Sequence, residues 1–173
     1  EAVISSRIGL SAAAIEVTPT FDFWGRVTDE LTSGHRVDYL VCDEAQFYTE
    51  AQVNDLARIV DELGIDASCF GILTDFRTEL FPGSRRLVEL ADRIEMLQAR
   101  PRCWCGAPAT HNARIVNGVM VVEGDQIAIG DMDAAAVVRY EVLCRRHHRL
   151  RMPSSVGGMD LTPDPLPFDD TQA

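Results

Sequence analysis

The sequence predicts an α/β fold: a parallel-sheet core followed by a small zinc-ribbon-like β subdomain. A buried strand, a capped helix and a second buried strand follow one another within residues 37–73, which is typical of a βαβ unit. A pair of cysteines before a hairpin motif, and a cysteine with a histidine after it, predict the subdomain. With 173 residues, of which 46% are hydrophobic, the chain is long enough to bury a core. We expect the core over residues 1–100, the subdomain over 101–151 and a disordered tail over 152–173.

The first predicted strand is VDYLVC, residues 37–42, because β-branched and aromatic residues crowd a short apolar run. Thr49 and Gln52 then form a capping box, and apolar residues at helical spacing continue to Gly64. IDASCFGIL, residues 65–73, is the second buried strand. A loop follows, and Ser84 is expected to cap a second helix. The buried stripe expected for that helix is Leu87, Leu90, Ala91, Ile94 and Leu97.

Charge and composition exclude several classes of protein. A formal net charge of −11 repels a phosphate backbone, so we expect no nucleic-acid partner. The basic run 145–151 is interpreted as a solvated end of the subdomain. No apolar run approaches the roughly 18 residues that a membrane span needs, so we expect no membrane partner. Five cysteines, an odd number, argue against a secreted disulfide framework and favour a cytoplasmic protein with a metal site.

Two carboxylates, Asp43 and Glu44, follow the first predicted strand directly. Ligands of open parallel sheets bind beyond the carboxyl ends of the strands, so this position favours a functional site. A solvated turn is the alternative, because acidic residues are common in loops after strands. Position alone leaves both interpretations open.

Four soft ligands bracket the hairpin motif Asn117-Gly118, and their arrangement predicts a structural zinc site. They are Cys103, Cys105, Cys144 and His147. Buried free thiols are the alternative, because C-x-C is tighter than the usual ligand spacing. His148 could replace its neighbour as the fourth ligand. Cys42 and Cys69 lie within the predicted strands and are interpreted as packed thiols.

The order of motifs along the chain resembles the type II thymidine kinase family over residues 1 to about 151. The motifs that carry the resemblance are SRIGL, VDYLVCDEAQF, FGILTDF, LFPGS, IAIG, Y-x3-C and C-x2-H. The resemblance implies a P-loop kinase-like core with a zinc-bearing lasso domain, ATP and thymidine as substrates, and a homo-oligomer, a tetramer. The activity implied is transfer of the ATP γ-phosphoryl group to the 5′-hydroxyl of thymidine, for nucleoside salvage. A non-catalytic zinc-ribbon module that binds nucleosides or proteins is the alternative.

The resemblance also implies roles for individual residues. Asp43 would hold Mg²⁺ through water beside the ATP phosphates, and Glu44 would be the general base. Phe47, Phe76 and Phe81 would wall the thymine pocket with Ile72; the last two rings lie in a polar loop, which is not a core pattern. Further substrate contacts would come from Asn112, Ile129, Gly130 and Tyr140.

Three departures from the family pattern stand out. No G-x4-G-K-S/T motif occurs, although the resemblance places such a phosphate-binding loop before SRIGL, so we expect a fragment that binds thymidine without phosphorylating it. Asn112 stands where a Thr against the thymine methyl is common, which leaves the choice between thymidine and deoxyuridine open. The segment between Gly130 and Tyr140 is longer than usual.

Overall fold

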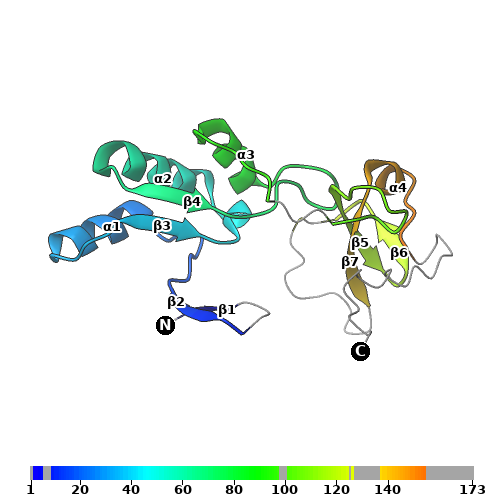
Figure 1. The fold of residues 1–173 in the computed structure, drawn as a ribbon, viewed down its shortest axis with the longest axis horizontal. Helices are drawn as coiled ribbons and strands as arrows, with labels where there is room; N and C mark the ends of the chain where they lie inside the picture. Colours follow the sequence, from blue (N-terminus) through cyan, green and yellow to red (C-terminus); the bar gives the residue numbers. More distant parts are fainter. Residues whose placement is uncertain (1, 6–8, 98–100, 125, 127–136, 155–173) are drawn as a thin grey trace, which may run out of the picture. The chain divides into compact units, whose positions relative to one another are not determined.

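The structure is a computed structural model, and it describes residues 2–5, 9–97, 101–124, 126 and 137–154. The chain divides into two compact units (Figure 1). Unit 1 comprises Glu1–Leu73 and Leu80–Ile94, and unit 2 comprises Thr74–Glu79 and Glu95–Ala173. Helices and strands occur in both units, so the predicted mixed α/β class is confirmed.

The centre of unit 1 is the predicted strand, helix and strand: β3 (Tyr39–Cys42), α2 (Glu50–Leu63) and β4 (Asp66–Cys69). The two strands pair in parallel with Cys42 opposite Cys69, which confirms the βαβ unit (Figure 1). Thr49 and Gln52 form the predicted capping box. Gly64 ends the helix with a φ of 65°, a left-handed conformation that glycine adopts without steric cost.

The sheet of unit 1 is shorter than predicted, because β4 ends at Cys69 rather than near residue 73. One further hydrogen bond, from the Phe70 amide to the Cys42 carbonyl, continues the pairing. At Gly71 the backbone then passes so close to the Gln46 side chain that a Cβ atom would collide with it. Beyond Phe70, the apolar run therefore leaves the sheet and packs against the loop that follows β3.

Unit 1 also contains α1 (Phe23–Thr32), α3 (Pro82–Leu90) and the antiparallel hairpin of β1 (Ala2–Ser5) and β2 (Ser11–Ala14). The main core of this unit joins α1, α2, the β3 end and the loop behind it. Its buried residues are Phe23, Val27, Cys42, Ala45, Tyr48, Val53, Leu56, Ile59 and Ile65.

The prediction that Ser84 caps the second helix is wrong. Helix α3 begins at Pro82, a residue whose fixed φ suits the first helical position, and it ends at Leu90. Ser84 lies inside the helix, where its hydroxyl donates to the Ile72 carbonyl at 2.8 Å. The predicted apolar stripe does not extend past the helix, since Ile94 and Leu97 are 56% and 71% exposed.

Unit 2 is built on a three-stranded antiparallel sheet in the order β6-β5-β7. Its strands are β5 (His111–Val116), β6 (Val119–Val121) and β7 (Val138–Leu143), and the short helix α4 (Arg145–Arg149) follows. Asn117 and Gly118 join β5 to β6 with φ angles of 50° and 83°, which confirms the predicted hairpin turn.

The hydrophobic core of unit 2 is small. Its buried members are Cys103, Ala109, Ala113, Ile115, Met120 and Leu143, and half of them are short side chains. A sheet with so little apolar packing needs a further source of stability. Of the predicted tail, Ser154 donates its hydroxyl to Glu141 at 2.6 Å, and residues 155–173 lie outside the described part. Within the residues described, no helix is long and apolar enough to cross a membrane.

Candidate functional site

The exposed carboxylates Asp43 and Glu44 lie directly beyond the carboxyl end of β3, at the start of the short 3₁₀ helix η1 (Ala45–Phe47). Asp43 accepts a hydrogen bond from the Glu44 amide at 2.9 Å through its own Oδ1. Glu44 has a φ of 50°, a left-handed conformation that is uncommon outside glycine. Such local strain persists only where the surrounding structure holds it, and it is frequent at functional sites.

Gln46, which sequence reasoning missed, holds this loop in place. It is 1% exposed, its Nε2 donates to the Glu44 carboxylate, and its Oε1 accepts from the Ile72 amide at 3.3 Å. A buried amide thus links Glu44 to the segment that follows β4. The sequence signal that could have identified Gln46 is its position: a polar residue between two apolar ones, two positions after Glu44.

The backbone of the carboxylate loop also lies against the first turn of α3. A Cβ atom at Gly83 would lie 2.5 Å from the Ala45 carbonyl oxygen and 2.7 Å from that of Tyr48, so only glycine fits there. Below the loop, burial raises the pKa of the Tyr48 phenol. The loop that presents the carboxylates therefore stands on a tightly packed base.

Three of the predicted nucleoside contacts belong to unit 1. Phe47 and Ile72 are 50% and 46% exposed, so both leave apolar surface uncovered within unit 1. Phe81 is 5% exposed and meets Phe47 edge-on, with ring centroids 5.6 Å apart. The expectation that Phe81 lies outside the core is therefore wrong, because the N-terminal end of α3 packs its ring against η1.

In unit 2, Phe76 is also buried, at 3% exposure, and this too corrects the expectation of a ring outside the core. The Arg114 guanidinium carbon lies 3.7 Å from the centre of its ring. Asn112 donates from Nδ2 to the Thr74 carbonyl at 2.9 Å, and Tyr140 is 62% exposed on β7. The predicted contacts Ile129 and Gly130 lie outside the described residues.

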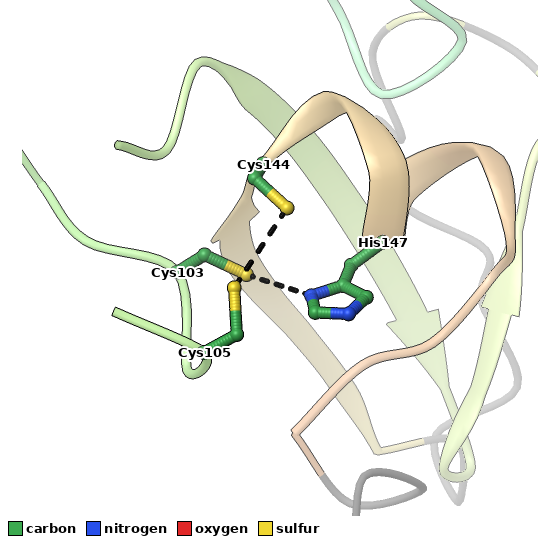
Figure 2. Close-up of side chains that lie close together, drawn as sticks. All are labelled: Cys103, Cys105, Cys144 and His147. Atoms are coloured by element: carbon green, nitrogen blue, oxygen red, sulfur yellow. Dashed lines mark hydrogen bonds between the residues drawn. The ribbon is translucent and has the colours of Figure 1, made fainter. Parts of the chain in front are cut away.

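The four predicted metal ligands come together in unit 2. Figure 2 shows Cys103, Cys105, Cys144 and His147 pointing toward one another, with their ligand atoms all within 4.8 Å. Cys103 Sγ lies 3.3 Å from His147 Nδ1, and the sulfurs of Cys105 and Cys144 are 3.9 Å apart. Tetrahedral zinc, with bonds of about 2.0–2.3 Å, places its ligands at about this separation. The donor set and spacing therefore fit such an ion.

The chain reaches this arrangement through two short local structures. The Gly106 amide donates to the Cys103 carbonyl at 2.8 Å, and this tight turn brings both sulfurs of the C-x-C motif to one side. Cys144 is the N-cap of α4, so His147 follows one helical turn later on the same side. The unusual C-x-C spacing is therefore compatible with two ligands.

Contacts around the cluster show why His147, and not His148, is its histidine. They also cover part of the cluster. The Trp104 ring, also missed by sequence reasoning, stacks on His147 with centroids 4.1 Å apart and donates from Nε1 to the Met152 carbonyl. His148 turns away from the cluster, since its Nε2 donates to the Phe76 carbonyl at 2.9 Å. Burial raises the pKa of the Cys103 thiol, whereas the His147 backbone amide helps lower that of Cys144.

Comparison with known proteins assigns the chain to a family. Residues 1–148 match the model of a family described as thymidine kinase. The chain is 55% identical to a thymidine kinase of Cutibacterium acnes, over 98% of this chain and 79% of that protein. It is 56% identical to one of Streptomyces avermitilis (96% and 78%) and 55% identical to one of Streptomyces coelicolor (99% and 80%). The chain therefore belongs to the thymidine kinase family.

Proposed function

We propose that the protein transfers the γ-phosphoryl group of ATP to the 5′-hydroxyl of thymidine. Membership of the thymidine kinase family carries this proposal, and it confirms the predicted enzyme class, an ATP-dependent phosphotransferase. The same membership favours an enzyme over the non-catalytic zinc-ribbon module. We further propose that the βαβ unit of unit 1 is part of a P-loop kinase-like core, which its parallel strands support.

Glu44 is proposed as the general base. The 5′-hydroxyl of the nucleoside loses its proton as it attacks the γ-phosphorus, and a carboxylate within hydrogen-bond reach accepts that proton. Glu44 is exposed beyond the strand end, while Gln46 Nε2 binds one of its oxygens and leaves the other to face a substrate. This arrangement supports a base whose position is fixed before the substrate binds.

Asp43 is proposed to hold Mg²⁺ through a water molecule. Magnesium keeps several waters and is commonly bound by one or two carboxylates together with substrate phosphates, which suits a single exposed Asp. The bound ion supplies neutralisation of charge on the ATP phosphates. The hydrogen bond from the Glu44 amide to Asp43 Oδ1 restrains the Asp43 carboxylate.

The nucleoside contacts are proposed separately for each unit. Unit 1 contributes Phe47, Ile72 and Phe81, of which the first two expose apolar surface suited to a flat base. Unit 2 contributes Phe76, Asn112, Ile129, Gly130 and Tyr140, and the exposed ring of Tyr140 supports its inclusion.

We propose zinc as the metal of the cluster in unit 2. Three thiols and one imidazole form a ligand set typical of structural zinc, with no position left for a reacting water. The ion would stabilise a subdomain whose own hydrophobic core is small. A tetramer, a cytoplasmic location and the absence of nucleic-acid and membrane partners stay predictions.

A steady-state assay of the full gene product with ATP and thymidine tests the activity. We expect thymidine monophosphate as product, and Phe47→Ala should raise the KM for thymidine about tenfold or more, as expected when a half-exposed aromatic contact is removed. Val88→Ala, which truncates an exposed apolar residue of α3, is the matched control and should leave KM unchanged. No thymidine monophosphate from the full gene product would refute the proposal.

A further inference from the structure

One histidine of unit 2 connects the metal cluster to the segment that carries Phe76. The His148 side chain is 7% exposed, and its Nε2 lies 2.9 Å from the Phe76 carbonyl oxygen. Since a carbonyl can only accept, Nε2 carries the hydrogen and donates it. The His111 ring of β5 lies beside the His148 ring, with centroids 5.3 Å apart and planes tilted by 45°. The His148 ring therefore contacts both β5 and residues 74–79.

Residues 74–79 form a strained turn that closes on itself. Asp75 donates its amide to the Glu79 carbonyl at 2.9 Å, and its carboxylate accepts from the amides of Arg77 and Glu79 at 2.8 and 3.0 Å. Thr78 has a φ of 71°, a left-handed conformation that is strained for a β-branched residue. Such a turn keeps one conformation only where its surroundings hold it.

Strand β5 supplies part of that support. Asn112 and Arg114 are two positions apart, so their side chains point to the same face of the strand. Asn112 donates to the Thr74 carbonyl at 2.9 Å, and the Arg114 guanidinium lies 3.7 Å from the Phe76 ring centre. His148 adds a contact from a different element, α4, to the backbone carbonyl of Phe76 itself.

A metal bound by the cluster would also hold helix α4. Its N-cap is Cys144 and it contains His147, and both belong to the group that could bind the ion. We propose that His148 is a positioning residue, which couples the metal-held helix α4 to residues 74–79 and so fixes Phe76 for binding of the thymidine base. The contact of Phe76 with the base rests on the proposed function, whereas the coupling itself rests on the contacts within unit 2.

Two polar substitutions of different reach test the hydrogen bond. His148→Gln keeps an N–H group near the position of Nε2, while His148→Asn is too short to reach the carbonyl. In the zinc-loaded protein, we expect the Asn variant to speed amide exchange in residues 74–79 about fivefold to tenfold, the effect of about one lost hydrogen bond. It should raise the KM for thymidine by a similar factor and leave kcat and metal content unchanged.

In the Gln variant, the amide exchange rate of residues 74–79 and the KM for thymidine should both be near those of the wild type. Arg149→Gln, an exposed neighbour on the same helix, is the control and should change neither. Equal behaviour of the Asn and Gln variants, or unchanged exchange in residues 74–79 of a metal-loaded Asn variant, overturns the proposal. Faster exchange with an unchanged KM supports the coupling and instead removes Phe76 from the proposed nucleoside site.

Removal of the metal from the wild-type protein gives a second test that depends on no variant. As a chelator removes zinc, amide exchange in residues 74–79 should accelerate together with that of α4. Continued protection of residues 74–79 after α4 has lost its protection would contradict the coupling.

Discussion

The two units hold their functional side chains in opposite ways. In unit 1 the carboxylates of Asp43 and Glu44 are exposed on a loop whose base is packed into a broad apolar core. In unit 2 the Cys103 and His147 side chains are buried, and the apolar core around them is small. Unit 1 thus gains its order from apolar packing, whereas unit 2 would gain it from a bound metal. The two units should therefore respond to different perturbations.

Loss of the metal should have the largest effect, and it should be confined to unit 2. Cys144→Ala removes one of four ligands, and structural zinc sites contribute on the order of 10 kcal/mol to the folding of small domains. We expect loss of zinc and of amide protection in β5 to β7, measured by metal analysis and hydrogen exchange. Cys69→Ala, which removes a half-buried thiol of unit 1, is the control for metal content. A C144A protein with full zinc and normal thermal stability would show that the cluster is misassigned.

A cavity in unit 1 should have the next largest effect, and the loss of stability should be confined to unit 1. Ile59 is 0% exposed, so Ile59→Ala should cost about 2–5 kcal/mol of unfolding free energy, measured by denaturant titration. Protection should fall in α2 and β4 while the zinc content stays at the wild-type value. Ile115→Ala makes the matched cavity in unit 2, where Ile115 is 1% exposed. If both variants loosened both units equally, the separation drawn between the units would be wrong.

Substitution of Asp75 should have a smaller effect on stability, and this effect should depend on pH. Burial acts to raise its pKa, but the Arg77 guanidinium and the amides of Glu79 and Arg77 outweigh burial and lower it. A lowered folded-state pKa stabilises the protein above the ordinary value near 4, and this contribution disappears as the pH falls through the folded pKa. Asp75→Asn should therefore lose about 1–3 kcal/mol at neutral pH, and its deficit should shrink in acid.

Thermal unfolding of the wild type and of Asp75→Asn over a pH series measures the difference in their stability. Acid effects that are common to the two proteins cancel in this difference. Glu79→Gln is the control, because Glu79 pairs with the same arginine from a side chain that is 64% exposed. Exposed pairs contribute little, and this variant should stay near the wild type. A deficit for Asp75→Asn that is the same at all pH values would contradict the lowered pKa.

Local patterns predicted much of this molecule. The capping box at Thr49, the C-cap at Gly64 and the Asn117-Gly118 turn are set by neighbouring residues, and each appears where predicted. The four metal ligands also converge, because a turn and one helical turn place them in pairs.

What sequence patterns could not predict depends on contacts between distant residues. The early end of β4 and the role of Gln46 both follow from the close approach of two loops that are about 25 positions apart in the chain. The Phe76 ring is covered by Arg114 of the distant strand β5, and the choice between the two adjacent histidines depends on the Phe76 carbonyl. No local spacing encodes these contacts.

Glu44 of unit 1 is the proposed general base of the reaction. The most direct test is the kcat of Glu44→Gln in the full gene product, measured beside the thymidine dissociation constant. We predict a fall in kcat of about 10²-fold or more, the typical contribution of a positioned base, with little change in thymidine binding. Glu50→Gln, an exposed carboxylate at the start of α2, should retain the wild-type rate. A near-normal kcat for Glu44→Gln would contradict the account.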